Sequence, residues 1–418
     1  MIQNKVRYLF IVMLLALIST EAIAQIDINF PMEQRPDSVE FAKAGNKPII
    51  KTSLNGVITA SGFYQNGSFG MGDGSITMWA NAVQPADKKN QFGGDLRKTW
   101  IILKATAYNL PDNWTASGRV EIDFLGGYAG QGGFADENLL PRLRVGYVEL
   151  HKNQTRIRLG QAWTPMVATF PASVTHFAMG YGSAGGIGFR NPGIFLYQNL
   201  NSKHSSTKVR LDAAVFRGSW LGAAGEPNGR DAGEIGIPQT EVGVFVENRS
   251  KTFKWEVSLV GHYDRKQIYN PLTKDYTGLT GKAIQLGTIL AYDNITLQGS
   301  IYTGRAIGQI WGNLLQFGDI RGNGAWAQAG YAFNKRLSAW FMYGYDNPND
   351  GDVKKAVTGD SRLHNQIFVP MIKYNLGPVN ISLEYFRAKT KWNAVNNEAS
   401  QIKRTSADQI ALGTSFMF

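Results

Sequence analysis

The sequence predicts an all-β fold, a transmembrane antiparallel β-barrel of about 16 strands with long outer loops and short periplasmic turns. Three observations predict it. Apolar and polar residues alternate in segment after segment, long and short connections follow one another regularly, and the last strand ends on a phenylalanine. Together these features are typical of proteins that cross a bilayer with strands instead of helices.

The alternation is clearest between residues 116 and 124. One face of this expected strand carries the apolar side chains of Val120, Ile122 and Phe124. The opposite face carries the charged side chains of Arg119, Glu121 and Asp123. A period of two places such sets on opposite sides of a strand, and the pattern recurs at 207–217, 241–247 and 379–384. Alternation alone leaves open whether the apolar face meets lipid or a protein core.

The connections decide between these two environments. Short links are expected at 110–113, 152–154, 199–206, 247–252, 293–294, 334–335 and 376–378. Long, mostly polar connections are expected at 65–96, 126–141, 164–189, 218–237, 263–280, 304–323, 346–364 and 388–407. Long loops outside the cell and tight turns in the periplasm are the pattern of outer-membrane barrels. Seven turns and eight loops join about 16 strands, a number at which a barrel encloses an aqueous channel.

The N-terminal region predicts export. Lys5 and Arg7 precede an apolar stretch at 9–18, and Ala22-Ile23-Ala24 matches a signal-peptidase site. We therefore expect a cleaved signal peptide at 1–24, a periplasmic leader at 25–53 and the barrel at 54–418. No later apolar run approaches the ~18 residues of a membrane helix.

The C-terminal strand points to the same compartment. Residues 408–418 alternate and end at Phe418, a pattern that we expect the barrel-assembly machinery to recognise. We expect the protein in the bacterial outer membrane, in contact with its lipid. Tyr and Trp near strand ends suit such an interface: Trp100, Tyr108, Trp114, Tyr147, Trp163, Tyr197, Trp255, Tyr263, Tyr292, Tyr331, Tyr343, Tyr345 and Tyr385.

The composition narrows the class of function. The absence of cysteine excludes disulfides, thiolate metal sites and cysteine nucleophiles. The five histidines are scattered, and the sequence has neither a Gly-x-Ser-x-Gly elbow nor a His-Glu-x-x-His motif. We predict no enzymatic activity, no cofactor and no metal. The net charge of +11 is expected on a pore wall or against anionic lipid, with no nucleic acid as partner.

A set of charged residues is predicted to line the pore. If Leu143, Val145, Ile157 and Leu159 face lipid, the arginines between them face the lumen and favour anions. The predicted pore-lining residues are Lys98, Lys104, Arg119, Glu121, Asp123, Arg142, Arg144, Arg156, Arg158, Arg190, Lys208 and Arg210. In the alternative, acids neutralise these cations and leave weak selectivity: Glu121, Asp123, Asp212, Glu241, Glu256 and Glu384.

Residues 164–189 are unusually apolar and glycine-rich for an outer loop, so we expect this third loop to fold into the barrel. Residues 180–185 match the dinucleotide fingerprint in form but lack its strand-then-helix setting, so their glycines are expected to serve packing. His176 is either a pH-sensitive pore residue or a loop residue without a special role.

Three sequence blocks resemble a known family: residues 118–127, 142–149 and 159–165. They resemble the sixteen-stranded bacterial porins and, within them, the DcaP-like trimeric outer-membrane channels. The resemblance implies a homotrimer, a third loop that narrows each pore and passive uptake of small, often negatively charged solutes. It implies pore-lining roles for Arg119, Glu121, Asp123, Arg142, Arg144 and Arg158. Residues 26–51 show no heptads of the kind that a trimeric coiled-coil stalk requires.

The expected function is passive diffusion of small hydrophilic solutes, with a preference for anionic or carboxylate compounds. One alternative is a phosphate- or oxyanion-selective porin, which would carry dense Lys and Arg ladders with few opposing acids. Another is a barrel enzyme or an adhesin, which would carry a clustered nucleophile and base or long structured outer loops.

Overall fold

The computed structural model describes residues 49–84, 90–126, 139–177, 179–202, 204–218, 229–230, 236–250, 252–270, 275–396 and 399–418. The predicted signal peptide and most of the predicted leader lie outside these residues. Strand β1 begins at Ile49, ahead of the predicted start of the barrel at Leu54.

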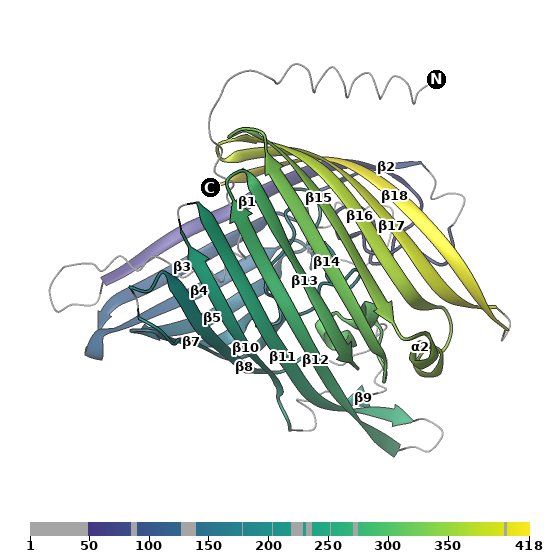
Figure 1. The fold of residues 1–418 in the computed structure, drawn as a ribbon, viewed down its shortest axis with the longest axis horizontal. Helices are drawn as coiled ribbons and strands as arrows, with labels where there is room; N and C mark the ends of the chain where they lie inside the picture. The colour runs from purple at the N-terminus through teal and green to yellow at the C-terminus, as the bar shows by residue number, and fades with distance from the viewer. Residues whose placement is uncertain are drawn as a thin grey trace.

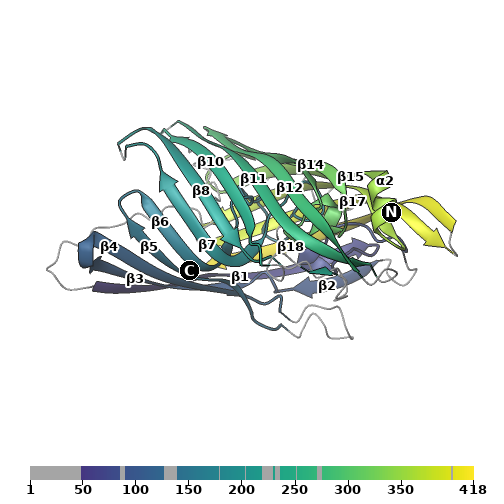
Figure 2. The same cartoon turned by 90° about the horizontal axis from the view of Figure 1, so that it is seen from below.

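The described chain forms one closed antiparallel barrel of 16 wall strands, as predicted (Figure 1, Figure 2). β1 (Ile49–Asn66) closes it by pairing with β18 (Ala399–Met417) on one side and with β2 and β3 on the other. β2 (Gln91–Asp95) and β3 (Trp100–Leu110) pair with successive parts of β1, so they act together as one wall strand.

The other wall strands pair in chain order with their neighbours. They are β4 (Trp114–Asp123), β5 (Arg142–Lys152), β6 (Thr155–Trp163), β7 (Arg190–Asn199), β8 (Thr207–Phe216), β10 (Gln239–Arg249), β11 (Phe253–Asn270), β12 (Asp275–Tyr292), β13 (Ile295–Arg305), β14 (Arg321–Ala332), β15 (Leu337–Pro348), β16 (Ser361–Leu376) and β17 (Val379–Asn396). The two-residue strand β9 (Gly229–Arg230) pairs with the far end of β11.

All seven predicted short turns separate consecutive wall strands. Several contain residues that tolerate positive φ, such as Asn153 at 56° and Gly377 at 72°. These turns lie at one end of the barrel, which we call the turn end, and the long connections lie at the other, the loop end. Among the described residues, no helix has both the length and the apolar character needed to span a bilayer.

Several predicted loops are partly or largely strand, which corrects the sequence-based boundaries. The connection predicted at 263–280 is mostly the outer part of β11 and β12, which pair up to Asn270 and Asp275. The connection at 388–407 is likewise the outer part of β17 and β18, and β2 lies within the connection at 65–96. The outer parts of β11, β12, β17 and β18 are rich in polar residues because they extend beyond the apolar belt, so their composition resembled that of loops.

The connection at 346–364 contains a helix, α2 (Asp350–Ala356), which the sequence analysis placed in a loop. The Asn349 side chain caps this helix by accepting hydrogen bonds from the backbone N–H groups of Gly351 and Asp352. Acidic residues in its first turn and lysines in its last turn complement the helix dipole.

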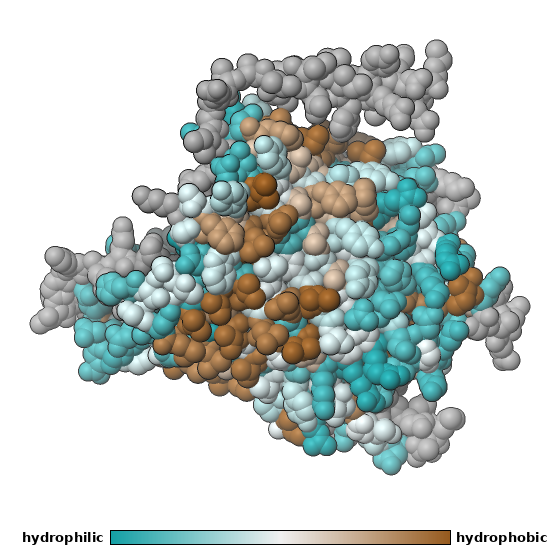
Figure 3. All heavy atoms as spheres, viewed as in Figure 1, coloured by the Kyte–Doolittle hydropathy of each residue, from teal (hydrophilic) through white to brown (hydrophobic). Residues whose placement is uncertain are grey.

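The apolar sets of the alternating strands point outwards, as the transmembrane prediction requires. Leu143, Val148, Leu159 and Ile194 each leave about half of their surface exposed. A soluble protein would bury such residues, whereas a bilayer accepts them. Figure 3 shows hydrophobic residues gathered over the middle of the wall around β10 to β12, with hydrophilic residues towards the end where α2 lies.

Candidate functional site

Residues 164–189, which we call the inner segment, lie against inward-facing polar side chains of the wall. The Met166 backbone N–H donates to Glu241 of β10 (2.8 Å), and the Thr169 hydroxyl donates to Gln298 of β13 (3.1 Å). Gln328 of β14 binds both backbone groups of Ala172, accepting its N–H (2.7 Å) and donating to its carbonyl oxygen (2.9 Å). Wall side chains thus satisfy backbone groups that a segment inside a barrel would otherwise leave without partners.

The strongest anchor of the inner segment is Glu384 of β17, which is fully buried. Its carboxylate accepts hydrogen bonds from the backbone N–H groups of Val174 (2.7 Å) and Thr175 (2.9 Å), and from the Ser173 hydroxyl (2.6 Å). The Nδ1 atom of His176 lies 3.0 Å from the same carboxylate, and its Nε2 atom lies 3.0 Å from Gln409 of β18. His176 is therefore part of the anchor, and its ring stacks on Phe386 at 4.9 Å.

The glycines of the inner segment permit close packing against the wall, as the sequence analysis expected. Gly185 has a φ of +85°, and a Cβ atom there would lie 2.3–2.5 Å from backbone atoms of Ala325 in β14. Only glycine fits both the left-handed conformation and this close approach. Residues 180–185 thus form a packing contact, and they do not form the strand-then-helix setting that a dinucleotide site requires.

Two further connections also turn inwards, and the sequence analysis did not predict this. Residues 67–84 contact the inner segment where the Phe177 N–H donates to the Ser75 carbonyl (2.7 Å). Residues 306–320 contact it where the Gly188 N–H donates to the Ile310 carbonyl (2.7 Å). These connections also contain apolar residues such as Met78, Ile310 and Trp311, and an apolar composition is the feature that predicted the inward fold of residues 164–189. The same criterion, applied to every connection, would have predicted that these two connections turn inwards.

The predicted pore-lining residues of β4 and β5 form one cluster of ion pairs. Arg119 and Arg144 both contact Glu121, at 2.8 Å and 3.0 Å. Arg142 makes a two-point contact with Asp123, with Nη2 at 2.7 Å and Nε at 3.0 Å. The predicted polar face of β4 therefore does point inwards, and its acids serve as partners for arginines of the same wall.

A β-bulge changes the predicted face of one residue. Val145 was expected to face lipid, but it is fully buried, and the pairing between β4 and β5 shifts at Glu121 and Ile122. The bulge inserts one extra residue, so Arg144 and Val145 both turn towards the inside. Leu143 and Leu159 keep their predicted outward faces. Sequence alternation cannot locate such a bulge, because the pattern on one strand does not show which residue its partner skips.

Arg190, at the start of β7, is buried without an ion-pair partner among the described residues. Only 5% of its surface is exposed, and its Nε and Nη1 atoms have no hydrogen-bond acceptor among them. Its guanidinium carbon lies 4.6 Å from the ring centre of Trp163 and 4.8 Å from that of Phe189. These aromatic faces provide a partial electrostatic compensation for the buried charge.

A second cluster lies nearer the turn end and centres on Glu149 of β5, which the sequence analysis did not include. Arg158 contacts Glu149 at 2.8 Å, and Arg156 lies at 4.0 Å. Lys104 of β3 interacts electrostatically with the same carboxylate. On β8, Arg210 pairs with Asp212 at 2.6 Å. These predicted residues share the inner face of the wall, but they form a group separate from that of Glu121 and Asp123.

Lys98 and Lys208 do not join either cluster. The Lys98 amino group donates to the carbonyl of Ser173, so it supports the inner segment. The Lys208 amino group donates to the Ser202 carbonyl at the turn end. Among the acids expected to neutralise the cations, Glu241 and Glu384 instead bind the inner segment.

Four aromatic residues predicted for the membrane interface lie inside the barrel instead. The guanidinium carbon of Arg144 lies 3.9 Å from the ring centre of Trp100, and that of Arg158 lies 3.9 Å from that of Tyr147. Similarly, Trp163 contacts Arg190, and Tyr197 contacts Arg156. Their position near strand ends was correct, but each side chain stacks on an arginine of the inner wall.

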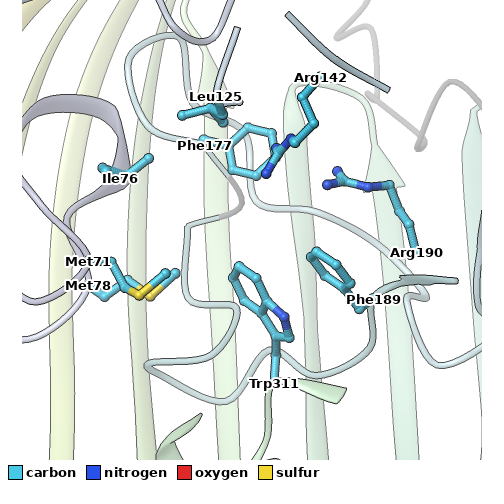
Figure 4. A pocket seen from close by; sticks show the side chains of 9 residues that line it. All are labelled: Met71, Ile76, Met78, Leu125, Arg142, Phe177, Phe189, Arg190 and Trp311. Atoms are coloured by element: carbon cyan, nitrogen blue, oxygen red, sulfur yellow. The ribbon is translucent and has the colours of Figure 1, made fainter. Parts of the chain in front are cut away.

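A pocket opens between the arginine cluster and the three inward-turned connections (Figure 4). Arg142 and Arg190 line one side of it. The rest of its lining is apolar and consists of Met71, Ile76, Met78, Leu125, Phe177, Phe189 and Trp311. Phe189 and Trp311 stack at 4.7 Å and form one wall of the pocket. Within the described part of the chain, no group of three or more His, Asp or Glu side chains is placed to bind a metal ion.

The architecture, a closed sixteen-stranded barrel with polar inner faces, is that of the porin class. The chain is similar to the outer membrane channel DcaP of Acinetobacter baumannii, with a TM-score of 0.67, 14% identity, and coverage of 90% of this chain and 99% of that one. It is also similar to an anion-selective porin from Comamonas acidovorans, with a TM-score of 0.54, 13% identity, and coverage of 88% and 100%.

A third similar structure is OmpT of Vibrio cholerae in a trimer form, with a TM-score of 0.53, 10% identity, and coverage of 88% of this chain and 99% of that one. No protein-family model matches the sequence. No functionally curated protein matches it significantly. At these identities the similarity establishes the fold, that of the outer-membrane porins.

Proposed function

We propose that this protein is an outer-membrane porin without catalytic activity that lets small hydrophilic solutes diffuse passively and favours anionic or carboxylate compounds. The observation that carries the proposal is the excess of positive charge on the inner face of β3 to β7. Among the described residues, four arginines surround the two carboxylates of Glu121 and Asp123. Lys104, Arg156 and Arg158 surround the single carboxylate of Glu149.

Such an arrangement favours anions without excluding cations. Paired acids reduce the field of the arginines, but the surplus cations leave a positive potential inside a low-dielectric wall. A phosphate-selective channel would need a ladder of cations with few acids, and the Glu121, Asp123, Glu149 and Asp212 partners weigh against it. The proposed pore-lining residues are the inward-facing members of both clusters.

The inner segment supports a proposed constriction. It is held at wall strands β10, β13, β14, β17 and β18. The segment also touches the opposite wall at Lys98, Trp163 and Arg190, so we propose that solutes pass along the parts of the arginine-bearing wall of β3 to β8 that it leaves uncovered. The narrowing would bring each solute close to the guanidinium groups, where electrostatic selection is strongest.

The wider setting is part of the same proposal. We propose a signal peptide at 1–24 that is cleaved on export, a homotrimer in outer-membrane lipid, and recognition of the C-terminal strand by the barrel-assembly machinery. The side chains of Phe416 and Phe418 lie on the outer surface, each 44% exposed, and suit contact with lipid or with that machinery. Support for the trimer comes from the Vibrio cholerae OmpT structure, which is described as a trimer form.

The test is conductance of the purified protein in a planar bilayer under a potassium chloride gradient. We expect discrete conductance steps and a reversal potential shifted towards the equilibrium potential of chloride. Steps without selectivity would refute the anion preference and keep the channel. A folded barrel that does not conduct would refute the channel and favour an enzyme or adhesin.

A further inference from the structure

The pocket beside Arg190 combines a buried positive charge with an apolar lining. Two of its lining residues, Arg142 and Arg190, belong to a cluster of four arginines with only two carboxylates among the described residues, so the cluster carries an excess of two positive charges. Transfer of uncompensated charge out of water is costly, and an incoming anion would reduce that cost. The pocket is therefore electrostatically prepared for a negative group.

Arg190 is the group best placed to receive the anion. Glu121 and Asp123 already hold the other three arginines at 2.7–3.0 Å. Arg190 has aromatic rings beside it but no acceptor among the described residues for Nε and Nη1, and its side chain points into the pocket (Figure 4). Arg142, whose side chain is 35% exposed, lies at the same side and can contribute a second contact.

The rest of the pocket lining is apolar and therefore disfavours strongly hydrated ligands. Met71, Ile76 and Met78 come from the connection after β1, and Leu125 follows β4. Methionine side chains are flexible and adapt to the shape of an aliphatic group. The cavity measures about 90 Å³. A single water molecule needs roughly 10–15 Å³ in the same measure, so this volume admits a short aliphatic chain beyond the carboxylate.

From this geometry we propose that the pocket is a binding site for a short aliphatic monocarboxylate, with the carboxylate at Arg190 and Arg142 and the chain against Met71 and Met78. The proposal rests on the proposed channel function and adds a preferred solute class to it. It places recognition in one apolar pocket and in Arg190, which has no ion-pair partner in the described part of the chain, apart from the general positive potential of the wall.

The experiment measures block of chloride current through the full-length protein by acetate, butyrate and the neutral amide butyramide. Butyrate is expected to block at about one tenth of the acetate concentration, because two further methylene groups leave water. Butyramide is expected not to block.

Two variants separate the charge from the apolar lining. Arg190→Gln is expected to weaken block by acetate and butyrate alike by about tenfold, the size of one lost charge-assisted hydrogen bond. Met71→Gln is expected to remove the advantage of butyrate over acetate while acetate block stays the same. Arg249→Gln removes an arginine that pairs with Glu247 at the turn end, outside the pocket, and is expected to change neither.

The outcomes distinguish this inference from the proposed function. A conducting wild type in which Arg190→Gln leaves block unchanged would overturn the pocket and keep the channel. Equal block by acetate and butyrate would also overturn it, because the apolar lining would then have no role. An Arg190→Gln variant that does not fold is replaced by Arg190→Lys, which keeps the charge but not the planar donor geometry and is expected to weaken block several-fold. A wild type without conductance would refute both.

Discussion

The two halves of the barrel wall use their inward-facing polar residues differently. From β10 to β18, Glu241, Gln298, Gln328 and Glu384 bind backbone groups of the inner segment. From β3 to β8, arginines and acids pair with one another and with aromatic rings. The first half consists largely of neutral amides and buried carboxylates that position a segment. The second half holds the excess positive charge that would act on a solute.

This difference shows that charge on a barrel lumen has two separate uses. A buried carboxylate such as Glu384 satisfies several N–H and O–H donors at once, so its replacement would affect structure. A carboxylate such as Glu149 offsets part of the field of nearby cations, so its replacement would affect selectivity. Substitutions on the two halves should therefore have different signatures in conductance measurements.

The largest effect is expected from Glu384→Ala. This substitution leaves the donors of Ser173, Val174, Thr175 and His176 without their acceptor and should disfavour the anchored inner segment by about 3–5 kcal/mol. Single-channel conductance should rise as the segment leaves the wall. Glu247→Ala, which removes a carboxylate paired with Arg249 at the turn end, is the matched control. Unchanged conductance in Glu384→Ala would contradict the anchor.

The next largest effect is expected on the wall of β3 to β8, where a substitution should shift the reversal potential in a direction set by the charge that it removes. Arg158→Met removes a cation from the Glu149 cluster and should move the reversal potential towards cation selectivity. Glu149→Gln should move it in the opposite direction, because the three cations would lose their acid. Both are read from the reversal potential in a salt gradient. Shifts of the same sign in both variants would contradict a selectivity set by net charge.

A smaller effect is expected from Gly185→Ala, at the contact between the inner segment and β14. The new Cβ atom would meet the Ala325 backbone at 2.3–2.5 Å, and the positive φ adds strain of about 1–3 kcal/mol. Gly359→Ala is a matched control, because it also has a positive φ (88°) but no atom within 4 Å of the new Cβ. The unfolding temperature from heat-modifiable gel migration should fall more for Gly185→Ala. Equal falls would show that the close approach has no cost.

The sequence was informative about features that depend on the pattern of a single strand or on the length of a connection. Alternation placed Arg119, Glu121 and Asp123 on one inward face, and connection lengths gave the number of strands. The sequence was uninformative where a feature depends on how two strands pair or how two loops pack against each other. The bulge that turns Val145 inwards depends on pairing with β4, and the contact of Trp311 with Phe189 depends on how two distant connections fold. Glu149 was missed for the same reason, because a strict period of two places it on the predicted lipid face with Leu143 and Val145.

The smallest effect is expected outside the wall, at the pair formed by Arg321 and Asp352 of α2. The Arg321 guanidinium lowers the pKa of Asp352 below its ordinary value. The pair therefore adds stability above the unfolded-state pKa of about 3.9, and this is lost as the pH falls through the lower folded-state value. Because the pair is exposed, Asp352→Asn should leave conductance unchanged and alter the unfolding temperature only slightly at pH 7. A change in conductance would show that this loop reaches the solute path.

The most direct test of the central claim is the accessibility of single cysteines, since the natural chain has none. Arg156→Cys places a thiol on the arginine-bearing wall, and Ala283→Cys places one where Met166 and Ile187 of the inner segment cover β12. A charged methanethiosulfonate reagent added during recording should reduce the current through Arg156→Cys and leave that through Ala283→Cys unchanged. Reaction at position 283 without reaction at position 156 would contradict a solute path along β3 to β8.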